Sequence, residues 1–175
     1  MPQGERTNVR QVKRKGWFIL IVIAIVTIGG GAYLLNAKTL VLQLQNMDHP
    51  RVLSVKIKPM EQFSIYYIHS IYQEPVVEEF EAAPNTITLK GVRTKSLAIA
   101  EQYGFDQQRD FHPMDEKLGA IFFRVAEGQG QGLIVRDRKI YLSEIGARGD
   151  RIQLSVRSIS VGTYLFAIFF EGFRI

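Results

Sequence analysis

The sequence predicts an all-β fold, an antiparallel sandwich or a partly open barrel, preceded by one N-terminal transmembrane helix. Two observations predict it: an uncharged run of 19 residues lies near the N-terminus, and after Asn36 apolar and polar residues alternate with a period of two. The 175 residues are 46% hydrophobic and 22% charged and include no cysteine. This composition excludes an intrinsically disordered chain, a disulfide-stapled domain and a thiolate metal site.

The N-terminal region divides into a basic tail, residues 1–16, and an apolar segment, residues 17–35. The tail holds five basic residues and one acidic residue, so it carries +4 of the net charge of +5 and leaves +1 for the rest of the chain. A nucleic-acid-binding domain carries a basic patch on its own surface, so this near-neutral remainder argues against nucleic acid as a partner. At about 1.5 Å per residue, a helix over 17–35 spans roughly 28 Å, close to the hydrocarbon thickness of a bilayer.

Two interpretations of the apolar segment remain open, a permanent single-pass anchor and a cleaved signal peptide. Gly30 and Ala32 suit the small-residue pattern of a cleavage site, whereas the full length of the segment favours an anchor or uncleaved signal. In both interpretations the basic tail lies in the cytoplasm, because positive charge flanking a span stays inside. The predicted location is therefore the cell membrane, with residues 36–175 forming an extracytoplasmic β domain.

Beyond Asn36 the chain consists of short runs rich in β-branched and aromatic residues, which favour strands. Turn-forming residues such as Pro84-Asn85 and Asp137-Arg138 separate the runs. About eight to ten strands of this kind are typical of a sandwich or a partly open barrel. In chain order the runs are 40–45, 52–58, 63–72, 76–82, 86–92, 120–127, 132–137, 139–145, 151–159 and 163–170.

Two segments depart from this alternating pattern. Residues 96–117 are polar and predict a short helix followed by a long loop, and long loops in compact domains are often functional. Residues 163–170, TYLFAIFF, are too few to cross a bilayer as a helix. They are predicted to form a core or edge strand, and an exposed edge this apolar would invite a partner strand.

The predicted hairpin formed by the third and fourth runs places a histidine beside a glutamate. A two-residue turn at 73–74 makes His69 the cross-strand partner of Glu78 and Tyr67 the partner of Phe80. The remaining pairs are apolar, which supports this register. Two interpretations follow: a buried, satisfied pair in which Glu78 fixes the tautomer of His69, or a polar notch that binds a ligand or a partner or senses pH.

Weaker candidate neighbours of this pair are Tyr67, His112 and Asp115. His112 and Asp115 could supply nitrogen and oxygen ligands, but the chain has three histidines in all and lacks the paired-histidine spacing of zinc enzymes. The sequence therefore predicts no metal, no cofactor and no catalytic residue.

The stretch from Phe63 to Phe80 contains Tyr67-Ile68-His69-Ser70, then Pro75-Val76 and Glu78. It resembles the signature of a family of small exported domains, domain of unknown function 1850, and the likeness extends more loosely from Leu40 to Val156. Members of that family often occur beside TRAP-type solute transporters of the TAXI subclass. The resemblance thus implies an accessory module whose partner is a transporter permease or a solute-binding protein, and it implies no catalytic residue.

These observations together predict a membrane-anchored, non-catalytic accessory or binding module outside the cytoplasm. Two alternatives stay open. One is a small envelope enzyme or metal-binding protein that uses His69 and Glu78. The other is a structural envelope protein that associates with itself through a strand at 163–170.

Overall fold

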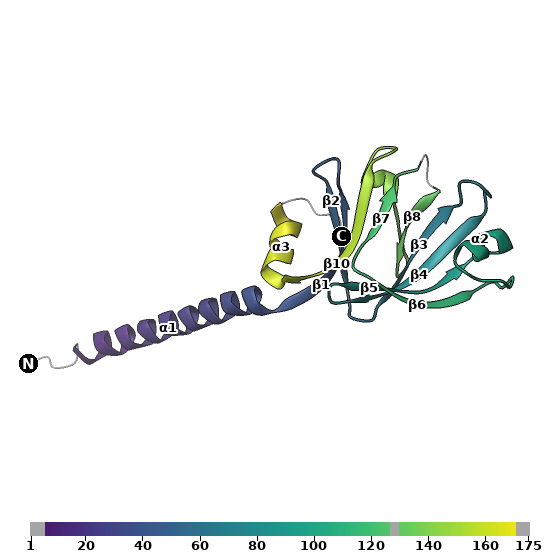
Figure 1. Ribbon diagram of the computed structural model, residues 1–175. Helices are drawn as coiled ribbons and strands as arrows, with labels where there is room; N and C mark the ends of the chain where they lie inside the picture. The colour runs from purple at the N-terminus through teal and green to yellow at the C-terminus, as the bar shows by residue number, and fades with distance from the viewer. Residues whose placement is uncertain (1–5, 127–129, 171–175) are drawn as a thin grey trace, which may run out of the picture.

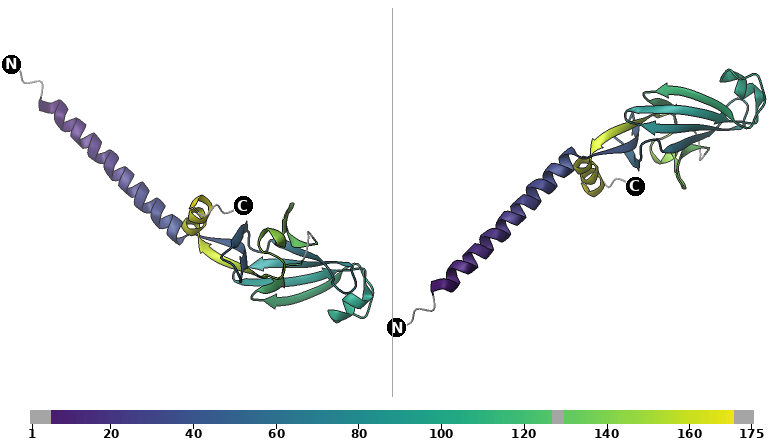
Figure 2. Two further views of the ribbon diagram at one scale, coloured as in Figure 1. Left: turned by 90° about the horizontal axis from the view of Figure 1, so that it is seen from above. Right: turned by 90° about the horizontal axis from the view of Figure 1, so that it is seen from below.

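A long N-terminal helix leads into two antiparallel sheets in the computed structural model, which describes residues 6–126 and 130–170 (Figure 1). Helix α1 comprises Arg6–Asn36. Its Trp17–Asn36 part has 20 residues and a mean hydropathy of 2.5, and none of it is buried against the rest of the protein. This part is long and apolar enough to cross a membrane. The further views show α1 projecting away from the sheets as a separate rod (Figure 2). The prediction of an apolar helix followed by an all-β domain is confirmed.

The first sheet has four strands in the order β2-β1-β10-β7, and every pair is antiparallel. The long central pair joins the start of the domain to its end, because Lys38 lies opposite Ser160 and Asn46 lies opposite Ile152. The strands are β1 (Lys38–Asn46), β2 (Val52–Ile57), β7 (Ile121–Arg124) and β10 (Arg151–Ser160).

The second sheet has six strands in the order β6-β5-β4-β3-β8-β9, also antiparallel throughout. A short helix, α2 (Leu97–Gln102), follows β5, and a 3-10 turn, η1 (Leu142–Glu144), follows β9. The strands are β3 (Gln62–Ile68), β4 (Pro75–Ala83), β5 (Thr86–Arg93), β6 (His112–Leu118), β8 (Gln131–Val135) and β9 (Arg138–Tyr141).

The core lies between the two sheets and consists of the apolar residues of the alternating runs. On β1 the residues Leu40, Leu42 and Leu44 all point inward and are at most 7% exposed. The rings of Phe63 and Phe80 stack in this core with their centroids 5.3 Å apart. A period of two puts alternate side chains on one face of a strand, so the sequence pattern and the buried face coincide.

The prediction of a C-terminal strand at 163–170 is wrong, because Val161–Phe170 forms helix α3. Every residue of the predicted strand except Thr163 is apolar, so no alternation distinguishes a strand from a helix there. Ser160 precedes the helix, and its Oγ accepts a hydrogen bond of 3.0 Å from the Thr163 backbone N–H, as an N-cap serine does. The predicted self-association through an edge strand at 163–170 is withdrawn with it.

The predicted long loop is shorter than expected, although the short helix within 96–117 is confirmed as α2. Residues from His112 onward form β6 at the edge of the six-stranded sheet. Most side chains of β6 are exposed, and the strand pairs with β5, while only Met114 and Leu118 pack against the core as apolar residues. Parts of the predicted segments, namely residues 1–5, Glu127 and 171–175, lie outside the described residues.

Candidate functional site

The predicted pairing of His69 with Glu78 is wrong, because the hairpin has another register. Glu78 lies opposite Ile65, and Tyr67 lies opposite Val76. Strand β3 ends at Ile68, and the chain turns through a six-residue loop, 69–74, instead of the two-residue turn expected. The register differs by four residues, an even number, so the faces predicted for both strands are still correct.

Glu78 has a different partner, Tyr103, which follows directly after α2. The Tyr103 hydroxyl donates a hydrogen bond of 2.6 Å to Oε1 of Glu78, and the Tyr67 hydroxyl lies 2.7 Å from the Tyr103 hydroxyl. The single proton of Tyr103 is used on the carboxylate, so Tyr67 must donate to Tyr103. The three side chains form one chain of hydrogen bonds that runs from Tyr67 to the carboxylate.

Burial changes the acid–base behaviour of all three groups. It raises the pKa of the Glu78 carboxyl above its ordinary value, although the hydrogen bond from Tyr103 partly opposes the shift. Burial likewise raises the pKa of Tyr67, and it raises the pKa of Tyr103 far above the ordinary value with the help of the nearby carboxylate. Both phenols therefore stay protonated and act as donors at neutral pH.

The raised pKa predicts that Glu78→Gln stabilises the domain at neutral pH. The folded state favours the protonated form of Glu78. The contribution of this protonation to stability is complete below the ordinary pKa of 4.5, and it is lost as the pH rises through the higher pKa that Glu78 has in the folded domain. Glutamine keeps an acceptor for Tyr103 but does not ionise. Urea unfolding of the full chain in detergent should show the variant to be more stable at neutral pH, with the difference closing below pH 4.5.

The matched control is Glu79→Gln, one residue along β4 and on the opposite face, where the carboxylate pairs with Arg93. Its free energy of unfolding should fall by less than about 1 kcal/mol, as for other exposed ion pairs. A Glu78→Gln variant that is no more stable than wild type at neutral pH would show that burial of the ionised carboxylate does not destabilise the domain.

A cavity of about 730 Å³ opens beside this cluster at one end of the two-sheet domain, and we call it the end cleft. One wall comes from the end of β3 and the 69–74 loop, and the other comes from β7 and the start of β8. Its volume is in the range of ligand sites in proteins. The polar groups in its lining come from Tyr67, His69, Ser70, Gln73, Arg124 and Gln131.

His69 is held rigidly in the wall of the end cleft. Its Nδ1 accepts hydrogen bonds from the backbone N–H groups of Ile71 and Tyr72, each at 3.4 Å. The proton therefore resides on Nε2, which donates to the Gln102 side chain at 3.1 Å. The histidine thus connects the 69–74 loop to α2, which also supplies Tyr103 at its end.

The other two predicted neighbours lie elsewhere, on β6. His112 is 2% exposed, and its ring packs on Phe105 with centroids 4.6 Å apart. Asp115 is exposed and accepts a hydrogen bond of 2.6 Å from Lys90. Within residues 6–126 and 130–170, no group of three His, Cys, Asp or Glu side chains is placed to hold a metal ion.

Of the predicted site residues, the structure therefore joins Tyr67 to Glu78 through Tyr103. His69 is linked to the same segment, because it bonds to Gln102 at the end of α2. It adds three residues that sequence reasoning missed: Gln102, Tyr103 and Arg124. No local sequence pattern marks them, because their positions depend on how α2 and β7 pack against β3.

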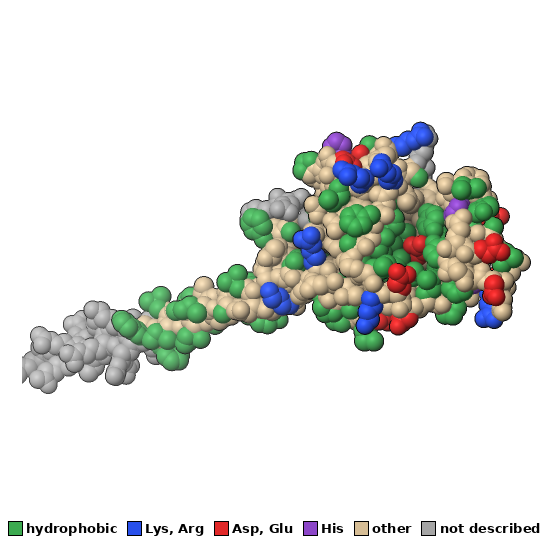
Figure 3. All heavy atoms as spheres, viewed as in Figure 1, with side chains coloured by type: hydrophobic (Ala, Val, Ile, Leu, Met, Phe, Trp, Pro, Cys, Tyr) green, Lys and Arg blue, Asp and Glu red, His purple; other side chains and the backbone are tan. Residues whose placement is uncertain are grey.

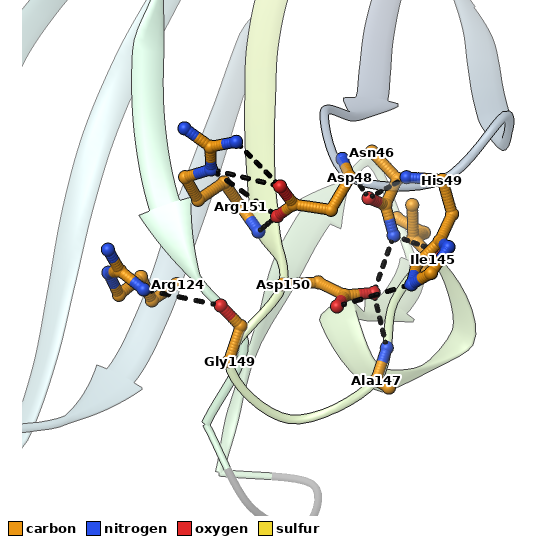
Figure 4. Close-up of polar contacts among 9 residues, drawn as sticks. All are labelled: Asn46, Asp48, His49, Arg124, Ile145, Ala147, Gly149, Asp150 and Arg151. Carbon is orange, nitrogen blue, oxygen red and sulfur yellow. Dashed lines mark hydrogen bonds and ion pairs between the residues drawn. The ribbon is translucent and has the colours of Figure 1, made fainter.

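A second polar cluster lies at the end of β1 (Figure 4). Asn46 is 4% exposed, and its Nδ2 donates to the Ile145 carbonyl at 3.2 Å and to the Asp150 carboxylate at 2.8 Å. Its Oδ1 accepts from the backbone N–H groups of Asp48 at 2.9 Å and His49 at 3.0 Å. All of its partners belong to turns of the domain, so this cluster has a structural role.

Comparisons with known proteins do not assign a family to the chain. No family model, no curated protein and no solved structure matches it. Its role is therefore inferred from the N-terminal helix, the end cleft and the buried Glu78 cluster.

Proposed function

We propose that this protein is a single-pass membrane protein whose β domain lies outside the cytoplasm and binds a partner through the end cleft. The apolar helix supports the anchorage, since Trp17–Asn36 is long enough to span a bilayer. The basic tail that precedes it supports the orientation. Apolar side chains cover the described part of this rod in Figure 3, as expected of a surface that contacts lipid.

The observation that carries the binding role is the position of the end cleft. His69 in the wall of the end cleft contacts α2. In Figures 1 and 2, α2 lies at the end of the domain farthest from α1. With α1 in a membrane, the end of the domain that holds α2 lies away from the bilayer. The end cleft therefore lies in the part of the domain that faces a partner or a solute outside the membrane.

The chemistry of the end cleft favours binding over catalysis. Ser70 and His69 both line it, but the two ring nitrogens of His69 already have hydrogen-bond partners. A histidine in this state does not take the proton of a serine, as nucleophilic catalysis requires. Side chains of Arg124, Gln73 and Gln131 provide donors and acceptors that suit recognition of a polar surface.

We propose further that the partner is a component of a solute transporter, a permease or a solute-binding protein of the TRAP type. The support is the resemblance of residues 63–80 to the exported family described above. These residues form β3, the 69–74 loop and the start of β4, and the loop lies in the wall of the end cleft. Tyr67-Ile68-His69-Ser70, which carry part of the resemblance, are thus also part of the lining proposed to bind.

Site-specific photo-crosslinking tests this proposal in native membranes. A photoreactive amino acid replaces Ser70 in the end cleft or, as a matched control, the exposed Ser143 outside it. Illumination should trap a transporter component with the Ser70 variant and not with the Ser143 variant. Equal capture at both positions, or no adduct at Ser70, would contradict a binding role for the end cleft.

A further inference from the structure

The C-terminal helix α3 is fixed at the point where α1 enters the β domain. The Val161 backbone N–H donates a hydrogen bond of 2.8 Å to the Ala37 carbonyl, one residue beyond the end of α1. A Cβ on Gly162 would lie 3.1 Å from the Leu34 carbonyl oxygen, so α3 passes close to the last turn of α1. Both helices meet at the same end of the domain in Figures 1 and 2.

One side of α3 rests on the domain, and another side faces outward. Tyr164 is 8% exposed, and the Lys56 ammonium lies 5.9 Å from the centre of its ring. Phe169, more than one turn later, is 78% exposed. The helix Val161–Phe170 contains no charged residue, and at about 1.5 Å per residue its ten residues reach roughly 15 Å, half of what a bilayer crossing needs.

Three basic residues belong to the strands of the sheet beneath this apolar helix. Lys38 lies opposite Ser160, the residue before α3, and Arg157 and Lys56 lie on either side of Val41 on the sheet beneath it. All three basic residues are exposed. Figure 3 shows basic side chains at the junction of the rod and the domain, whereas the acidic side chains visible in that view lie farther out on the domain.

We infer that α3 lies in the surface of the membrane from which α1 emerges, with Phe169 among the lipid chains and the three basic residues at the phosphate level. This inference rests on the proposed insertion of α1. An apolar helix that is already held beside the end of a membrane span can enter the interface without losing further translational and rotational freedom. Interfacial helices of this kind bury their apolar face by about 5–10 Å and are favoured by neighbouring Lys and Arg.

The span of α1 and the contact of α3 with the membrane surface together restrict how the domain tilts on the membrane. The covalent connection between α1 and β1 is residue 37 alone, so without α3 a single span would leave the attached domain free to swing. A second attachment through α3 holds the four-stranded sheet at a set angle. The end cleft is then kept at a defined height above the bilayer.

Tryptophan fluorescence with brominated lipids tests the inference in the full chain. The chain has one tryptophan, Trp17, which lies in the apolar part of α1. Wild type, Trp17→Phe/Phe169→Trp and Trp17→Phe/Ile71→Trp are reconstituted in vesicles of phosphatidylcholine and phosphatidylglycerol with or without brominated acyl chains. Ile71 is the matched control, since it is 74% exposed and lies in the 69–74 loop at the far end of the domain.

The brominated chains should remove most of the emission of Trp17 and of the tryptophan at 169, and should leave the tryptophan at 71 unchanged. Quenching at 17 without quenching at 169 would overturn the place of α3 and leave the anchorage intact. A blue-shifted, unquenched tryptophan at 169 would mean that a second copy of the chain covers α3, and would equally overturn it. An unquenched Trp17 would overturn the anchorage and the inference together.

Discussion

Replacing Phe80 with alanine is expected to lower the free energy of unfolding of the β domain by about 3–5 kcal/mol. Phe80 is 1% exposed, and its ring stacks on Phe63 with the planes inclined by 17°. The change removes buried ring surface and leaves a cavity between two sheets whose backbones are fixed by hydrogen bonds on both sides. The neighbouring strands therefore cannot move in to fill the space, and the full cost of the cavity remains.

Chemical unfolding of the full chain in detergent, followed by the far-ultraviolet circular dichroism of the strands, measures this effect. Phe122→Ala is the matched control, because Phe122 lies on β7 and is 66% exposed. Its effect should remain within about 0.5 kcal/mol, as for most surface substitutions. Equal losses for the two variants would mean that the apolar contact between the sheets does not hold the domain together.

Replacing Asn46 with alanine is expected to cost about 2–4 kcal/mol, the second-largest effect. The substitution deprives the Asp48 and His49 N–H groups of their acceptor, and the Ile145 carbonyl and the Asp150 carboxylate of their donor. The Asp150 carboxylate loses the hydrogen bond that contributes most to its lowered pKa. Several polar groups in and around a buried site are then left without a partner at once.

The same unfolding measurement checks this prediction, with Gln45→Ala as control on the neighbouring position of β1. Gln45 is only partly buried and faces the other side of the strand, so its loss should cost less than about 1 kcal/mol. A stability of Asn46→Ala equal to that of Gln45→Ala would show that the turns around Asp150 form without the asparagine.

The alternation of apolar residues predicted most of the strands, because one face of each sheet lies in the core; on β1 the other face is covered only in part, at Val41. Leu40, Leu42 and Leu44 on β1 illustrate this, since they are all buried and alternate with residues of the other face. The same reasoning failed at the C-terminus, where an almost uniformly apolar stretch has no periodicity and an N-cap serine begins a helix. It also failed at β6, an edge strand in which three charged residues separate the apolar residues Met114 and Leu118 that pack against the core.

The candidate site was predicted only in part, for a different physical reason. The alternation placed Glu78 correctly on the inner face of its strand, among buried residues. The partner of a buried carboxylate, however, depends on the hairpin register and on packing between distant segments. The loop before β4 is four residues longer than a tight turn, which moves His69 away, and α2 brings Tyr103 to Glu78 from 25 residues along the chain.

Cysteine accessibility tests the central claim, the membrane topology, most directly. The wild-type chain has no cysteine, so Thr7→Cys in the basic tail and Ser70→Cys in the end cleft each introduce a single reactive thiol. In intact spheroplasts a membrane-impermeant maleimide should label the cysteine at 70, and it should label the cysteine at 7 only after the membrane is opened. Labelling of position 7 but not of position 70 in intact spheroplasts would contradict the account.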